Sequence, residues 1–165
     1  MPHSLAIRWL VRFLIGAAFV LALFGVCHAA ETYAPFRPDL PAGNGETVLV
    51  VDDEQSIRQI TRETLEAFGY HTLLASDGHE AVSLYAAHLS AIDVVLTDMM
   101  MPVMDGPATI RLLMEINPAV KIIAASGITA NRDIAVKAGA GVKNFLTKPY
   151  TAETLLKCLK QTLAE

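Results

Sequence analysis

The sequence predicts an α/β fold in which a doubly wound, five-stranded parallel sheet is flanked by five helices. Between residues 47 and 163, five short apolar runs alternate with five segments of helical period. The apolar runs are nearly continuous, which is typical of strands that are buried on both faces. Such alternation implies right-handed crossovers, with helices on both sides of the sheet.

The first strand is expected at residues 47–51, and the first helix, at 54–68, ends at Gly69. One stripe of that helix should face the sheet: Ile57, Ile60, Thr64, Leu65 and Phe68. A second strand at 71–76 leads to a second helix at 77–88. The inward positions of the second helix are Ala81, Leu84 and Tyr85.

The second half of the chain continues the alternation. The third strand is expected at 92–97, and Asp105 caps a third helix that ends near residue 116. The remaining elements are a strand at 120–125, a helix at 130–138, a strand at 142–147 and a helix at 151–163. The last helix should pack on the core through Leu155, Leu159 and Leu163.

Polar side chains stand where four of the expected strands end: Asp52 and Asp53, Asp98, Ser126 and Lys148. The carboxyl ends of parallel strands share one edge of the sheet, and ligands bind at that edge. Each residue alone has an ordinary explanation, as a helix cap or as part of a turn. Their joint placement at successive strand ends indicates a site.

The chemistry of the site follows from its acids. Strands one and three are expected to be neighbours, which brings Asp52, Asp53 and Asp98 within a few ångströms of one another. Carboxylates that close repel one another unless a cation lies among them, and Mg²⁺ suits such an oxygen cluster. Asp98, at the start of a loop, can then take a phosphoryl group, whose charge Lys148 would neutralise. The Lys148–Pro149 bond is a candidate cis peptide.

Residues 47–163 resemble the response-regulator receiver domain over nearly its full length. The matching motifs are Val50-Val51-Asp52-Asp53-Glu54, Asp98-Met99-Met100-Met101-Pro102, Met104-Asp105-Gly106, Ala125-Ser126-Gly127 and Thr147-Lys148-Pro149-Tyr150. The likeness is greatest to receivers at the C-terminal end of hybrid sensor kinases. It implies a flavodoxin-like fold with strand order 2-1-3-4-5.

The resemblance implies that Asp98 takes a phosphoryl group from a phosphohistidine on a histidine kinase or a histidine phosphotransfer protein. It implies that Mg²⁺ is bound by Asp53 directly, by Asp52 through water, by Asp98 and by the backbone carbonyl of Met100. Ser126 and Lys148 would hold the phosphoryl oxygens. Beyond this self-phosphorylation and a slow autodephosphorylation, no enzymatic activity is expected.

Slow hydrolysis is expected because the two positions that tune phosphoryl lifetime in this family are the apolar Met100 and Ile128. Neither side chain can orient an attacking water. The resemblance also implies a switch, in which Ser126 moves toward the phosphoryl group and Phe145 turns inward. The face formed by residues 130–138, 142–147 and 151–163 would change shape. Phe145 lacks a tyrosine hydroxyl, which should favour the inward position; a plain core residue is the alternative.

The N-terminal segment conflicts with that function. Residues 1–30 place Arg8 and Arg12 before an apolar run, 13–27, as a cleavable signal peptide does. A membrane-retained helix that associates with the bilayer and a misassigned start are the alternatives. Arginines ahead of the run predict export, whereas a receiver needs a kinase supplied with ATP in the cytoplasm, so the compartment stays open. A Pro/Gly linker, 31–46, then leads to the receiver domain, 47–165.

Composition excludes several classes. Residues 46–165 carry 10 basic and 15 acidic side chains with no basic stripe, which argues against nucleic acid as a direct ligand. Cys27 and Cys158 match no zinc or redox spacing, and Cys158 is expected to be a small buried residue. A receiver-shaped protein-binding module that works without phosphorylation is the main rival. An aspartyl phosphatase of the dehalogenase type needs an acid where Met100 stands, and a P-loop hydrolase lacks its motif.

Overall fold

The computed structural model describes residues 40–127 and 142–165. The chain divides into two units, Met1–Pro38 and Asp39–Glu165, and all that follows concerns the second. The signal-like segment at 1–30, Ile128 and the helix expected at 130–138 lie outside the described residues. Among the helices that are described, none has the length and apolarity needed to cross a membrane.

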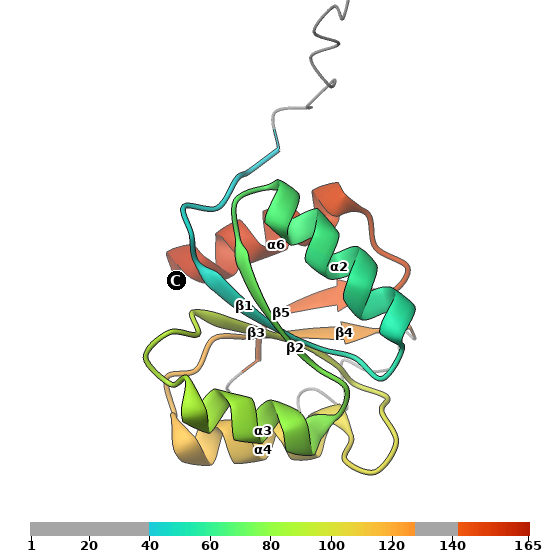
Figure 1. Ribbon diagram of the computed structural model, residues 1–165, viewed down its shortest axis with the longest axis vertical. Helices are drawn as coiled ribbons and strands as arrows, with labels where there is room; N and C mark the ends of the chain where they lie inside the picture. Colours follow the sequence, from blue (N-terminus) through green and yellow to red (C-terminus); the bar gives the residue numbers. More distant parts are fainter. Residues whose placement is uncertain (1–39, 128–141) are drawn as a thin grey trace, which may run out of the picture. The chain divides into compact units, whose positions relative to one another are not determined.

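Five parallel strands form one sheet in the order β2-β1-β3-β4-β5, which confirms the predicted order (Figure 1). The strands are β1 (Thr47–Val51), β2 (His71–Ala75), β3 (Val94–Asp98), β4 (Ile122–Ser126) and β5 (Val142–Thr147). β3 and β4 begin and end later than expected, so that Asp98 and Ser126 are the last residues of their strands. β3 and β4 are buried throughout, as continuous apolar runs predict.

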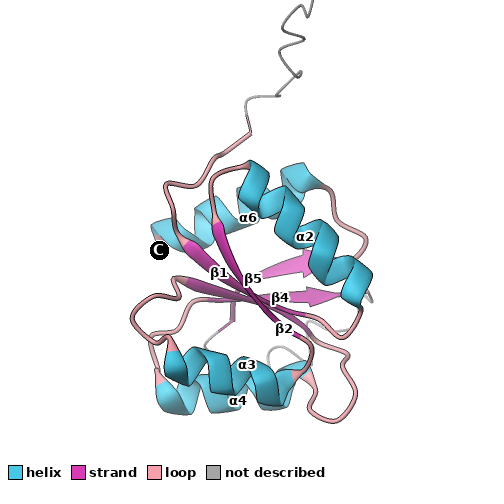
Figure 2. Ribbon diagram, in the orientation of Figure 1, coloured by secondary structure: helices cyan, strands magenta, loops and turns pink. Residues whose placement is uncertain are grey.

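Four of the five expected helices fall within the described part of the chain. α2 (Gln55–Ala67) and α6 (Ala152–Ala164) cover one face of the sheet, and α3 (Gly78–Ala87) and α4 (Gly106–Ile116) cover the other (Figures 1 and 2). Side-chain caps fix three of the helix starts. Asp77, Asp105 and Thr151 each accept a hydrogen bond from a backbone amide in the first turn of the helix that follows.

A separate apolar cluster fills the space on each face of the sheet. Successive side chains of a strand point to opposite faces, so β1 contributes to both clusters. Leu49 and Val51 pack toward α3 and α4, whereas Val48 and Val50 pack toward α2 and α6. All four are buried, and burying such a side chain stabilises the fold by about 1.5–3 kcal/mol.

The buried stripe of α2 differs from the one predicted. Thr61 and Leu65 are the buried positions, whereas Ile60 is 63% exposed. Thr61 and Leu65 lie four residues apart on one side of the helix, and Ile60 is turned to its flank. The hydroxyl of Thr61 is satisfied by that of Tyr150, at 3.3 Å, so burial of a polar residue is tolerated here.

Residues 40–46, expected to be the end of a linker, pack on the domain and are called the N-terminal strap below. The amide of Gly43 donates to the carbonyl of Phe68 at 2.8 Å, and that of Gly45 to Gly69 at 3.0 Å. Leu40 packs against the cluster under α2 and α6. The folded unit therefore begins ahead of the expected boundary at residue 47.

Gly43→Ala should lower the free energy of unfolding by about 1–3 kcal/mol, the usual cost of overpacking. A Cβ at this position would lie 2.7 Å from ring carbons of Tyr70, which is itself buried and cannot yield easily. Urea denaturation of both proteins measures the difference. Gly127→Ala is the matched control, because no atom of the described residues lies within 4 Å of its added methyl group. Equal loss in both variants would contradict close packing of the strap.

Candidate phosphoacceptor and metal site

All five residues singled out at strand ends lie at the carboxyl edge of the sheet. β1 and β3 are neighbours in register Val51↔Thr97, so Asp52 and Asp98 leave the sheet side by side. Ser126 ends β4 and Lys148 follows β5. Carboxylate oxygens of Asp52, Asp53 and Asp98 lie within 4.8 Å of one another.

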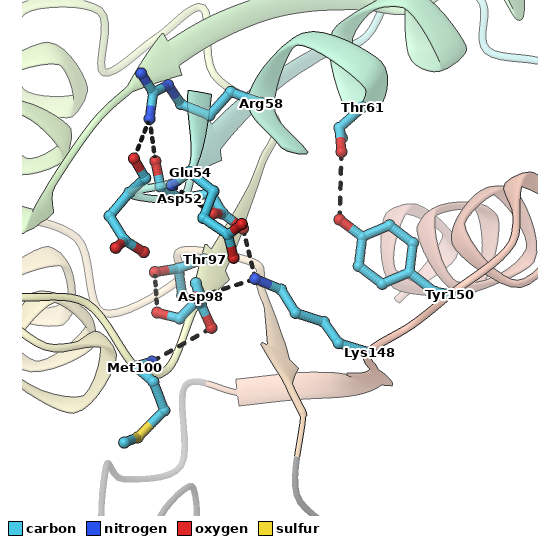
Figure 3. Close-up of polar contacts among 10 residues, drawn as sticks. Asp52, Glu54, Arg58, Thr61, Thr97, Asp98, Met100, Lys148 and Tyr150 are labelled. Carbon is cyan, nitrogen blue, oxygen red and sulfur yellow. Dashed lines mark hydrogen bonds and ion pairs between the residues drawn. The ribbon is translucent and has the colours of Figure 1, made fainter. Parts of the chain in front are cut away.

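Lys148 joins two of these acids (Figure 3). Its Nζ lies 2.6 Å from Oδ2 of Asp52 and 3.0 Å from Oδ2 of Asp98, whose side chains are only 4% and 9% exposed. Burial alone would lower the pKa of Lys148, but the hydrogen bonds and charges of the two acids outweigh it and raise the pKa above its ordinary value. The lysine is therefore a fixed positive charge in this site.

The backbone brings Lys148 to that position. Its amide donates to the carbonyl of Ser126 at 2.8 Å, which ties the end of β5 to the end of β4. The Lys148–Pro149 peptide is cis, as predicted. Ser126 is buried, with 9% of its surface exposed.

Asp98 begins a loop that is held against α4. The amide of Met100 donates to Oδ1 of Asp98 at 3.3 Å, while the Met100 side chain is 64% exposed. Gly106, at the start of α4, closely approaches this loop, since a Cβ there would lie 2.5 Å from the carbonyl oxygen of Asp98. Only glycine allows that approach.

The donor set fits a hard divalent cation. Three carboxylates face one ammonium group, which leaves an excess of negative charge. Within the described part of the chain, the exposed carboxylate of Asp53 has neither a hydrogen bond nor an ion pair. Mg²⁺ accepts one or two carboxylates and keeps water in its other positions, which suits such an arrangement. The role of the Met100 carbonyl as a further ligand stays a prediction.

Two features of the site were not predicted. Nη1 of Arg58 donates to the carbonyls of Asp52, at 2.6 Å, and Asp53, at 2.9 Å (Figure 3). Tyr150, which follows Lys148 and Pro149, meets Thr61 of α2, and its burial raises the pKa of its hydroxyl. An arginine in the first turn of a helix gives only a weak sequence signal, because such side chains commonly extend into solvent.

Phe145 and Cys158 differ from their expected burial. Phe145 is 44% exposed, so the plain core interpretation is wrong for this conformation, and the side chain does not occupy the inward position that was expected to be favoured. Residues on β5 alternate between exposed and less exposed positions, and Phe145 falls on an exposed one. Cys158 is half-buried, and burial raises the pKa of its thiol.

A family model confirms the resemblance. The model of the response regulator receiver domain matches residues 48–160, and the chain therefore belongs to this family. The match begins after residues 1–30 and gives no support to a signal peptide or membrane anchor there.

Three relatives illustrate the range of the family. The probable transcriptional regulator ycf27 of Guillardia theta is 35% identical over 118 residues, 71% of this chain and 45% of the relative. The sensor kinase CckA of Brucella abortus is 33% identical over 71% of this chain and 12% of the relative. The chain thus spans less than half the length of the ycf27 and CckA proteins. A solved receiver domain of sensor histidine kinase PA1611 from Pseudomonas aeruginosa, with a coordinated magnesium ion, gives a TM-score of 0.67 at 26% identity, covering 73% of this chain and 99% of that one.

Lys148→Met should lower the free energy of unfolding by about 2 kcal/mol near pH 8 without Mg²⁺, because two buried carboxylates lose their partner. The folded-state pKa of Lys148 is raised, so its contribution is complete below the ordinary value of 10.5 and is lost as the pH rises through the higher folded value. Urea denaturation in a chelator, repeated toward alkaline pH, should show the two proteins converging. A constant difference would contradict this origin.

Proposed function

We propose that this protein is the phosphoacceptor of a two-component phosphorelay and that Asp98 carries the phosphoryl group. The observation that carries the proposal is the contact of Lys148 with both Asp52 and Asp98 beside the third acid, Asp53. This arrangement brings a carboxylate oxygen, a fixed positive charge and a cluster of acids into one small volume, which supports the proposal. Receiver domains as a family generally act as phosphoacceptors, which supports the proposal.

The transfer is a displacement at phosphorus. An oxygen of Asp98 forms the new P–O bond while the P–N bond of the donor phosphohistidine breaks, and the departing imidazole nitrogen keeps the electron pair and takes up a proton. Lys148 would neutralise charge on the phosphoryl oxygens, and the hydroxyl of Ser126 would donate a hydrogen bond to one of them. Asp53 and Asp98 would hold a Mg²⁺ ion directly and Asp52 through water, and that ion would supply the remaining neutralisation.

The proposed donor is a histidine kinase or a histidine phosphotransfer protein. Relatives that are themselves sensor kinases, CckA and PA1611, support that class of donor. Such donors draw on ATP, so we propose that the domain works in the cytoplasm. The intact mass of the protein recovered from cells tests this compartment, because a mature chain beginning near residue 30 would mean that the segment ahead of it directs export.

The proposed output is a change at Phe145 and the β5 and α6 surfaces around it. Phe145 is exposed in the described conformation, which leaves it free to turn inward when Ser126 moves toward a phosphoryl group. This would be a population shift between two packings, driven by one local charge event.

Acetyl phosphate and Mg²⁺ should add one phosphoryl group to the wild-type protein, and Asp98→Asn should remain unlabelled. Intact-mass spectrometry counts the groups. Asp105→Asn is the matched control: it removes an acid from the same loop, but asparagine can replace aspartate as the cap of α4. Labelling of Asp98→Asn, or none of the wild type, would overturn the proposal. The second outcome would favour the binding module that works without phosphorylation.

Met100→Asn should shorten the lifetime of the phosphoryl group by up to roughly tenfold, since one hydrogen bond to an attacking water is worth about that much. Loss of the label is followed by mass after the donor is removed. Val103→Asn, which places the same amide on an exposed position farther along the loop, is the control. An unchanged half-time for Met100→Asn would count against the expected slow hydrolysis.

A further inference from the structure

Arg58 is a component of the site that the transfer chemistry does not use. It lies in the first turn of α2, and helix side chains point back toward the N-terminus. Its guanidinium therefore reaches the loop between β1 and α2, where one nitrogen, Nη1, donates to two successive carbonyls, those of Asp52 and Asp53 (Figure 3). We propose that Arg58 is a positioning residue that fixes this loop so that the Asp53 carboxylate faces a bound divalent cation.

The backbone carbonyls of Asp52 and Asp53 need Arg58 as a partner because they accept none of the first backbone hydrogen bonds of α2. The amides of Ile57 and Arg58 both donate to the carbonyl of Glu54, so the hydrogen bonds of α2 begin after the acid pair. Glu54 is the N-cap residue, and its side chain makes no capping hydrogen bond. The start of this helix is thus held from the loop side, by Arg58 and by the Asp52 carboxylate, which accepts from the Glu54 amide at 3.0 Å.

Asp53 depends on this restraint more than the other acids do. The Asp52 carboxylate is held by Lys148 and by the Glu54 amide, and the Asp98 carboxylate by Lys148 and the Met100 amide. Among the described residues, nothing comparable holds the Asp53 carboxylate, which is exposed. Its direction is set by its own backbone, and Arg58 fixes that backbone through the Asp53 carbonyl.

The charge of Arg58 has the opposite effect on a cation. A guanidinium close to a divalent ion repels it, so charge alone would make Arg58 weaken binding. Glu80 of α3 offsets a small part of this charge: hydrogen bonds from Ser76 chiefly lower the pKa of Glu80, and the charge of Arg58 lowers it slightly further. Because positioning and repulsion predict changes of opposite sign, one measurement separates them.

The test is the affinity of the full chain for Mg²⁺, measured by calorimetry with no phosphoryl donor. Arg58→Met should weaken binding about tenfold, as loss of a group that orients a metal ligand commonly does. Arg62→Met is the matched control, since it removes the same charge and shape one turn later on α2, where the Arg62 Nε has no hydrogen-bond partner among the described residues. Its affinity should stay within about twofold of wild type, as expected for a residue outside the ligand shell.

Unchanged or tighter binding by Arg58→Met would overturn the positioning role. If that variant does not fold, Arg58→Lys takes its place: it keeps the charge but loses the planar group, and weaker Mg²⁺ binding is again expected, whereas wild-type affinity would overturn the role. The inference rests on the metal site of the proposed function. A wild-type protein that binds no Mg²⁺ would overturn both, whereas wild-type binding with no effect of Arg58 would overturn the inference alone.

Discussion

The ammonium group of Lys148 holds together the two nearly buried carboxylates of Asp52 and Asp98. The rest of the fold brings these three side chains into contact. In a poorly solvated environment Asp52 and Asp98 would repel each other strongly without Lys148. The strand order makes the contact possible, because β1 and β3 are neighbours and β5 ends at the same edge. β3 and β4 are buried along their whole length, which favours a fixed position of Asp98 at the end of β3.

Helix α2 links the two halves of the site. Arg58 holds the acid-bearing loop, and Thr61, one turn later, meets Tyr150 just beyond Lys148. Residues three apart lie on the same side of a helix, so a single rigid element spans the distance between the cluster of acids and the segment that follows Lys148. The 3.3 Å separation of the two hydroxyls is long for such a bond, and the stronger restraint is at the acid-bearing end.

The sequence was sufficient to predict the sheet and the strand-end residues, because the alternation of runs and the direction of parallel strands together determine which side chains meet. The orientation of α2 was not predictable to one residue, since Ile60 and Thr61 are adjacent and only packing selects the buried one. Proline and glycine in residues 40–46 suggested a linker, whereas close approach of Gly43 to Tyr70 is a tertiary effect. The hydrogen bonds of Arg58 are likewise made to backbone atoms and leave no pattern in the sequence.

The N-terminal strap determines at which edge of the sheet the preceding chain joins the domain. Residues 40–46 lie beside the turn between α2 and β2 and lead into the amino end of β1, whereas the acids stand at the carboxyl ends of the strands. The described polypeptide thus enters at one edge of the sheet, and the acids of the candidate site lie at the other. A fluorophore, an affinity handle or a surface tether joined ahead of residue 40 would attach to the domain at the amino ends of the strands. The acids at the carboxyl ends would stay accessible to another protein.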